Sequence, residues 1–195
     1  KALQAGTSHF LGQNFAKAFD VKFITKENKE EYVWASSWGV STRLVGGLIM
    51  THSDDDGLVL PPRLAPLHVI ILPVIPKEEQ QETVMNYCEQ LQEDIQQQCF
   101  DGLSVKVDID RREMSGGRKK WDWVKKGVPI RLEVGPRDVE SNAVFMSRRD
   151  LQDQKGQTVN RDAFVQQVVS YLDDIQNTLY QRALDHRQNN TRMID

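Results

Sequence analysis

The sequence has no long apolar run and very little cysteine. No stretch approaches the ~18 consecutive apolar residues that a membrane-spanning helix needs, and the longest apolar run, at residues 68–74, has the length of a strand. No basic segment followed by an apolar one opens the chain, so there is no signal-peptide pattern. These absences predict a cytoplasmic protein without a membrane partner. Because the chain begins at Lys1, inside a patterned segment, we expect it to be a piece of a longer protein.

Only two cysteines are present, Cys88 and Cys99. Both lie in a stretch whose pattern predicts a single helix, with about three turns between them, which excludes a disulfide bridge. This cysteine usage fits a reducing compartment. No cysteine pair has the spacing of zinc ligands, so the sequence predicts no metal site within the chain.

The charges are unevenly distributed along the chain. Residues 76–110 contain two basic and nine acidic residues, a net charge of −7, whereas residues 111–149 contain eleven basic and five acidic residues, a net charge of +6. A local basic face is the usual footprint of a polyanionic partner. Two solvated faces that offset each other explain the charges equally well.

The first third of the chain has strand-like patterns separated by turns. Strands are expected at residues 1–12, 21–24 and 32–37, a short helix at 15–19, turns at 28–31 and 53–57, and a loop leading into a buried helix or strand at 39–50. Three prolines between residues 61 and 66 predict an extended, semi-rigid segment. This segment is the expected domain boundary.

Beyond residue 66, strands and helices alternate. The continuous apolar run at 67–74 predicts a strand covered on both faces, and apolar residues at helical spacing predict a helix over 78–99. Further elements are a strand at 105–109, a basic helix at 117–126, strands at 130–134 and 143–146 joined by a turn at 135–138, and a long amphipathic helix capped by Asn160. This order predicts an α/β domain with a mixed sheet flanked by helices.

Two groups of residues in the first third suit a ligand site. Polar residues and glycines crowd the strand at residues 4–15, either as a wall that hydrogen-bonds a ligand or as a capped strand end. Arg43 follows Trp38 and Gly39 in a stretch of small residues. A guanidinium group can stack on an aromatic ring and donate two hydrogen bonds to a phosphate, which are the contacts that an ATP site requires. The alternative is a core arginine that forms a salt bridge. The P-loop pattern is absent.

A third group lies at residues 127–138. Arg131 and Glu133 alternate with apolar residues on a predicted strand, so both should project to one face, and Arg137 follows in a turn. Two fixed guanidinium groups beside a carboxylate can read base edges and phosphates. The alternative is an ordinary exposed strand with ion pairs.

Taken in order, four strings resemble prolyl-tRNA synthetases of the archaeal and eukaryotic type, also found in some bacteria. They are GTSHFLGQNF at 6–15, SWGVSTR at 37–43, THSDDDGLVLPPRLAP at 51–66 and GVPIRLEVGPRD at 127–138. The threonyl, histidyl and glycyl enzymes share the architecture, but the first two strings resemble the prolyl enzyme best. The resemblance implies the C-terminal part of a class II antiparallel catalytic sheet at 1–65, an anticodon-binding domain at 66–155, and a helix at 156–195 leading to a further domain.

The resemblance also implies roles for individual residues. It assigns ATP contacts to Gln4, Thr7, Ser41, Thr42 and Arg43, with Arg43 counted as catalytic because it stacks on adenine and reaches the γ-phosphate. It assigns the proline pocket to His9, Trp38 and Gly39, and the anticodon contacts to Arg131, Arg137 and Lys155. Some members carry Glu where this chain has Val124. That base contact is therefore changed here, or is supplied by Asp122.

The activity that the resemblance implies is proline–tRNA ligation. L-proline is activated by ATP with Mg²⁺ and transferred to tRNA(Pro), in a homodimeric parent protein. The parts of the family that build the dimer and hold the substrate carboxylate are not in this sequence, so we expect the chain alone to be inactive. The alternatives are a non-catalytic tRNA-binding paralogue and a sister class II synthetase for another amino acid.

Overall fold

The computed structural model describes residues 3–151 and 155–192. Contacts divide the chain into two compact units, Lys1–Thr51 and His52–Asp195. The division falls before the proline-rich segment because residues 53–60 belong to the second unit: Asp54 pairs with Arg149, and Val59 joins the main core. The proline-rich segment is a turn, not an extended linker, since the Ala65 amide donates to the Pro61 carbonyl at 3.0 Å. A φ near that of proline suits the start of a turn as well as an extended chain.

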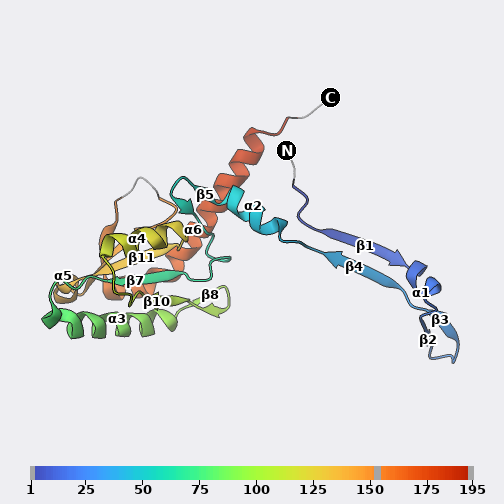
Figure 1. Ribbon diagram of the computed structural model, residues 1–195, viewed down its shortest axis with the longest axis horizontal. Coiled ribbons are helices and arrows are strands. Elements are labelled where there is room, and N and C mark those ends of the chain that lie inside the picture. Colours follow the sequence, from blue (N-terminus) through green and yellow to red (C-terminus); the bar gives the residue numbers. More distant parts are fainter. Residues whose placement is uncertain (1–2, 152–154, 193–195) are drawn as a thin grey trace. The chain divides into compact units, whose positions relative to one another are not determined.

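The first unit is a two-stranded antiparallel ribbon with short additions (Figure 1). Its elements are β1 (Thr7–Gly12), α1 (Asn14–Ala18), β2 (Lys22–Ile24), β3 (Glu30–Tyr32), β4 (Ala35–Gly39) and α2 (Arg43–Thr51). β1 pairs with β4, and β2 pairs with β3, so the turn expected at residues 28–31 gives way to a strand at Glu30.

Among the residues described in this unit, no second layer covers the ribbon and buries its apolar side chains. Phe10 and Trp38 are each 78% exposed, and Ala16 is the buried residue of the described part of this unit. Residues 43–51 form a helix, but the expectation that this segment is buried is wrong for the chain as it stands, because none of its residues is buried.

The second unit is built on a five-stranded mixed sheet with strand order β10-β7-β11-β12-β13. The strands are β7 (Val69–Pro73), β10 (Val107–Ile109), β11 (Ile130–Val134), β12 (Ala143–Arg148) and β13 (Gln157–Asn160). β7 runs parallel to both β10 and β11, while β12 is antiparallel to β11 and β13. The predicted α/β class with a mixed sheet is confirmed.

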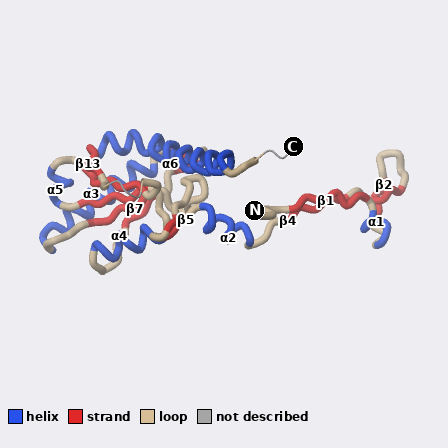
Figure 2. The backbone as a smooth tube through the Cα atoms, turned by 90° about the horizontal axis from the view of Figure 1, so that it is seen from above, coloured by secondary structure: helices blue, strands red, loops and turns tan. Residues whose placement is uncertain are grey.

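Helices lie on both sides of this sheet, as Figure 2 shows, with α6 above the strands and α4 below them. They are the 3-10 turn η1 (Glu78–Gln80), α3 (Gln81–Gln96), α4 (Gly116–Lys125), α5 (Pro136–Glu140) and α6 (Arg161–Asn189). Two hairpins complete the unit: β5 (Ser53–Asp54) with β6 (Gly57–Leu58), and β8 (Cys99–Phe100) with β9 (Leu103–Ser104).

One face of the sheet carries the main core and the other a much smaller one. α3 and α6 pack against the first face through the apolar stripes that the sequence predicts: Val84, Cys88, Leu91 and Ile95 from α3, and Phe164, Val168, Leu172, Ile175 and Leu179 from α6. On the second face Ile70, Leu72 and Val128 form the smaller buried cluster, with Trp123 of α4 against it. Arg131 and Glu133 of β11 share this second face, whereas Arg148 at the end of β12 pairs with Asp174 of α6.

Two elements of this unit differ from the sequence prediction. The helix of residues 78–99 ends at Gln96, because Asp101 and Gly102 adopt left-handed φ values of 52° and 79° and close the β8–β9 hairpin. Cys99 therefore leaves the helix and is exposed, while Cys88 stays buried, and both thiols are free. Burial raises the pKa of Cys88 to about 12. The turn expected at residues 135–138 opens the short helix α5 instead.

The described ranges contain no helix that is long and apolar enough to cross a membrane. In the same ranges, no group of three or more His, Cys, Asp or Glu side chains could hold a metal ion.

The β5–β6 hairpin meets the end of α4 through two glycines in the left-handed region. Gly57 has φ 135° and Gly127 has φ 73°. A Cβ atom at Gly127 would come within 2.6 Å of the Leu58 carbonyl oxygen, and one at Gly57 within 2.5 Å of the Lys125 Cα. This contact fixes the hairpin against the helix.

We expect Gly127→Ala to lower the free energy of unfolding by about 2–4 kcal/mol, because it adds left-handed strain to an overpacked contact. Urea unfolding measures the change. Gly116→Ala is the matched control, since a Cβ at Gly116 meets nothing within 4 Å. Its effect should be neutral or stabilising by up to ~1 kcal/mol. Equal losses in the two variants would contradict the close contact.

Candidate nucleic-acid interface

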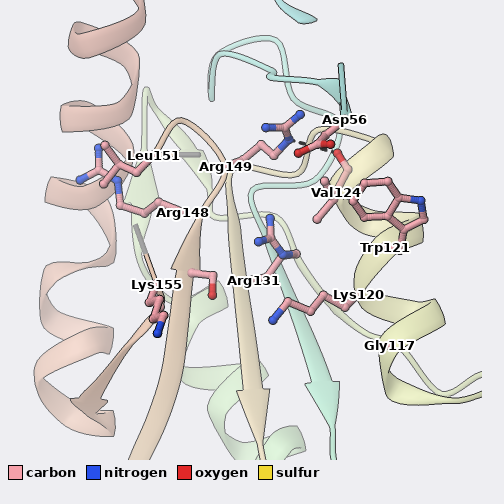
Figure 3. Close-up of a pocket in the computed structure, with 12 residues that line it drawn as sticks. Asp56, Gly117, Lys120, Trp121, Val124, Arg131, Arg148, Arg149, Leu151 and Lys155 are labelled. Carbon is pink, nitrogen blue, oxygen red and sulfur yellow. Dashed lines mark hydrogen bonds between the residues drawn. The ribbon is translucent and has the colours of Figure 1, made fainter. Parts of the chain in front are cut away.

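One face of α4 lines a cavity in the second unit (Figure 3). Gly117, Lys120, Trp121 and Val124 are spaced so that they share one side of the helix. The cavity has a volume of about 320 Å³. Its remaining lining comes from the β5–β6 turn, from β11 and from β12 with the residues after it: Asp56, Arg131, Ser147, Arg148, Arg149, Leu151, Lys155 and Gly156.

Like Arg149, Arg131 is a buried cation of this cavity. Its side chain projects from β11, and the residue is 7% exposed. The Nε and Nη1 atoms are buried and have no hydrogen-bond partner in the described residues. Burial, together with the neighbouring charge of Arg149, lowers the pKa of Arg131. A buried guanidinium with unused donors is costly to the fold. An acceptor that reached these two atoms, after a small movement of Arg131 or of its neighbours, would relieve that cost.

Neighbouring cations are matched by carboxylates. Lys120 Nζ lies 2.8 Å from Glu133 Oε1. Arg148 contacts Asp150 at 2.7 Å and Asp174 at 2.6 Å. Arg149 pairs with Asp54 and also donates from Nε to the Val124 carbonyl at 3.2 Å. The carboxylates neutralise these cations and hold them in place in the cavity lining around Arg131 (Figure 3).

The opposite face of α4 is anchored to Asp110. This carboxylate accepts hydrogen bonds from Arg112 Nη2 and from Trp123 Nε1, each at 2.7 Å. Its backbone carbonyl accepts from Lys119 Nζ at 3.0 Å. Burial alone would raise the pKa of Asp110, but the hydrogen bonds from Arg112 and Trp123 outweigh it and hold the pKa well below its usual value. The anchor fixes which side of α4 faces the cavity.

The sequence-predicted residues of this unit fall into two places. Arg131 and Lys155 both line the cavity of α4. Arg137 does not: it is exposed on α5 and lines a separate cavity of about 700 Å³, at the carboxyl ends of β7 and β11. Lys77 and Gln80 line that second cavity too.

The structure also places the other residues of interest in this region. Arg131 and Glu133 project to the same side of β11, as alternation predicts, because both face residues of α4. Val124 lies in the cavity wall. Asp122 does not line the cavity, and pairs instead with Arg112 at 3.1 Å and Lys125 at 3.3 Å. The sequence reasoning missed Lys120 and Trp121, although their spacing from Gly117 and Val124 could have revealed them.

In the first unit, the structure brings together Gln4 and Arg43. Arg43 Nη1 donates to the Gln4 side-chain oxygen at 3.2 Å and to its carbonyl at 3.5 Å. The Arg43 amide donates to Ser41 Oγ at 3.4 Å. The Thr42 carbonyl accepts from the amide of Val45 at 3.0 Å as α2 begins. Four residues assigned to ATP binding are thus close together: Ser41, Thr42 and Arg43 lie at the start of α2, and Gln4 is hydrogen-bonded to Arg43.

The ribbon register separates two residues assigned to proline. Thr7 lies opposite Gly39, Ser8 opposite Trp38, and His9 opposite Ser37. Side chains alternate along a strand, and directly opposed residues share a face. Trp38 is therefore on the opposite face of the ribbon from Thr7 and His9. A cavity of about 420 Å³ is lined by Gly6, Thr7, Ser8, Trp38, Gly39 and Val40, without His9.

The mixed sheet with helices on both faces and the cavity between α4 and β11 define an α/β domain with several cationic residues in one cavity lining. Residues 68–171 match the family described as "Anticodon binding domain". The chain belongs to this family.

Its relatives include proline–tRNA ligases, which confirms the resemblance read from the sequence. The chain is 52% identical over 194 residues to "Proline--tRNA ligase" of Bdellovibrio bacteriovorus and 53% identical over 195 residues to that of Salinibacter ruber. Each match covers 100% of this chain and 39% of the relative. A crystal structure of prolyl-tRNA synthetase from Cryptosporidium parvum, complexed with halofuginone and AMPPNP, matches with 37% identity and a TM-score of 0.79, covering 100% of this chain and 39% of that one. The chain thus spans about two fifths of the length of these relatives.

Proposed function

We propose that the chain is part of a cytoplasmic proline–tRNA ligase, and that its second unit binds the anticodon of tRNA(Pro). The observation that carries this proposal is Arg131, a nine-tenths-buried guanidinium whose Nε and Nη1 have no partner in the described residues. It lies in a basic cavity within the matched anticodon-binding region. Arginine donates two parallel hydrogen bonds to a guanine edge or to phosphate.

The anticodon contacts that we propose are Arg131 and Lys155 in one cavity and Arg137 in the other. Two cavities on one sheet suit a loop of single-stranded RNA, because unstacked bases can enter separate pockets. The Arg131 and Arg137 cavities open beside the same strand, β11, which contributes Arg131 to the first and Glu133 to the second. The unit would therefore hold successive unstacked nucleotides.

For the first unit we propose the ligand contacts of the catalytic domain. ATP, with Mg²⁺, would bind at Gln4, Thr7, Ser41, Thr42 and Arg43, and L-proline at His9, Trp38 and Gly39. The contact between Gln4 and Arg43 supports a shared site. The exposed Phe10 and Trp38 support a ribbon that packs against other parts of a longer, homodimeric protein, because contiguous exposed apolar surface marks an interaction site.

The direct test compares two RNAs. The chain is titrated with a proline tRNA transcript and with the same transcript carrying another anticodon, at one salt concentration, since phosphate contacts make the affinity salt-dependent. We expect the native anticodon to bind at least about tenfold more tightly, which is about 1.4 kcal/mol. Equal affinities would overturn the assignment of anticodon reading to this chain.

A further inference from the structure

Two tryptophans of α4, two residues apart, have opposite environments. Trp123 is held: its Nε1 donates to Asp110, and Lys126 Nζ lies 4.2 Å from its ring centroid. Trp121 is 49% exposed, and neither its ring nor its Nε1 has a partner among the residues described. The anchor through Trp123 therefore fixes Trp121 on the cavity side of the helix (Figure 3).

Apart from Lys120, which pairs with Glu133, the cavity wall around Trp121 is apolar on the helix side. Gly117 lies one turn before the indole and carries no side chain, and a Cβ there would meet nothing within 4 Å. Val124 continues the apolar wall one turn after it. The approach to the ring is thus open, and the ring is backed by apolar surface.

The opposite wall is cationic, with Arg131 on β11 and Lys155 beyond β12. An apolar, aromatic wall facing a guanidinium with unused donors suits a ligand that has a flat π face and hydrogen-bond acceptors. A free phosphate would use only the cationic wall, and an apolar peptide side chain would leave the Arg131 donors unsatisfied. A nucleotide base with its phosphate uses both.

We propose that Trp121 is a stacking platform for one unstacked RNA base, whose edge or adjacent phosphate binds Arg131. This inference rests on the proposed function and adds a further RNA-binding residue to it. Stacking on an aromatic ring does not depend on base identity, so Trp121 supplies affinity while Arg131 supplies discrimination. Val124, in the same cavity wall, has no side-chain group that could hydrogen-bond a base. Stacking on Trp121 would supply a base contact there instead.

The experiment uses the 195-residue chain and the anticodon stem-loop of a proline tRNA, with Trp121→Ala, Trp121→Phe and, as control, Tyr180→Ala. Tyr180 is an exposed aromatic residue of α6, 65% exposed, and does not line the cavity. We expect Trp121→Ala to weaken binding by about 5- to 100-fold and Trp121→Phe to stay within about threefold of the unaltered chain. Tyr180→Ala should bind as the unaltered chain does.

Two further readouts separate stacking from a charge effect or from misfolding. The plot of log affinity against log salt should keep its slope in Trp121→Ala, because the slope counts phosphate contacts and the indole makes none. RNA should quench tryptophan fluorescence in the unaltered chain, and this quenching should be lost in Trp121→Phe although binding remains. The thermal melting temperature should be unchanged in Trp121→Phe.

Unchanged affinity in Trp121→Ala, while the unaltered chain still prefers the native anticodon, would overturn the stacking role and leave the proposed function standing. A reduced salt slope in Trp121→Ala would also overturn it. Absence of any anticodon preference in the unaltered chain is a different result, and it would remove the proposed function first.

Discussion

Replacing Arg131 by methionine is expected to weaken binding of the native anticodon stem-loop by about 5- to 100-fold, the range for losing one bidentate arginine contact to a base. The guanidinium lies in the cavity with Nε and Nη1 unused, so the variant removes donors that have no role within the described part of the chain. A titration at fixed salt measures the loss. Arg118→Met is the matched control, because Arg118 lies on α4, is exposed and does not line the cavity.

The same variant should not lose stability. A buried charge without a partner opposes folding, and an apolar side chain of similar length removes that cost. We expect the free energy of unfolding of Arg131→Met to be equal to that of the unaltered chain or higher by about 1–3 kcal/mol. Weaker RNA binding with equal or greater stability identifies a binding residue. A clear loss of stability would mean that Arg131 makes contacts that stabilise the fold. That result would contradict the absence of hydrogen-bond partners for its Nε and Nη1 among the described residues.

Asp110→Asn is expected to lower the free energy of unfolding by about 2–4 kcal/mol. In the native protein the two carboxylate oxygens accept from Arg112 and Trp123. An asparagine offers one acceptor and turns the other position into a donor, which would face the donors already there. Because Arg112 is 40% exposed, water relieves part of this cost. Glu113→Gln removes an exposed carboxylate nearby and should change stability by less than ~0.5 kcal/mol.

The pH dependence of this effect has a defined sign. The folded-state pKa of Asp110 is depressed, so its contribution is present above the unfolded pKa and declines as the pH falls below about 4. The stability difference between the unaltered chain and Asp110→Asn should therefore be largest at about pH 6 and shrink towards about pH 2. Urea unfolding across this range measures it. A difference that does not change with pH would contradict the role given to the carboxylate.

Elements with a strong apolar period were predicted correctly from the sequence, whereas the end of one helix and the course of the proline segment were not. The α6 stripe and the buried strand β7 follow directly from apolar spacing. The end of α3 depends on the left-handed φ of Asp101 and Gly102, and this Asp-Gly pair is a hairpin signal that the sequence prediction overlooked. The proline segment at 61–66 is a turn, because fixing φ leaves ψ free to fold back.

The candidate site also has features that the sequence predicts and features that it does not. Alternation on β11 placed Arg131 and Glu133 on one face, and the structure has them so. The cavity itself is assembled from the β5–β6 turn, α4, β11 and the end of β12, and the pairing of Arg149 with Asp54 spans 95 positions. Such pairings are fixed by tertiary packing, and no local pattern encodes them. The separation of His9 from Trp38 likewise depends on a strand register.

In the proposed function, the Arg131 cavity reads the anticodon. The most direct test measures the affinity ratio between a proline tRNA transcript and its anticodon-swapped counterpart, in the unaltered chain and in Arg131→Met side by side. We expect a ratio of about ten or more in the unaltered chain, falling towards one in the variant, since base contacts carry the discrimination and phosphate contacts do not. A ratio near one in both proteins, or a high ratio that survives in Arg131→Met, would contradict the claim.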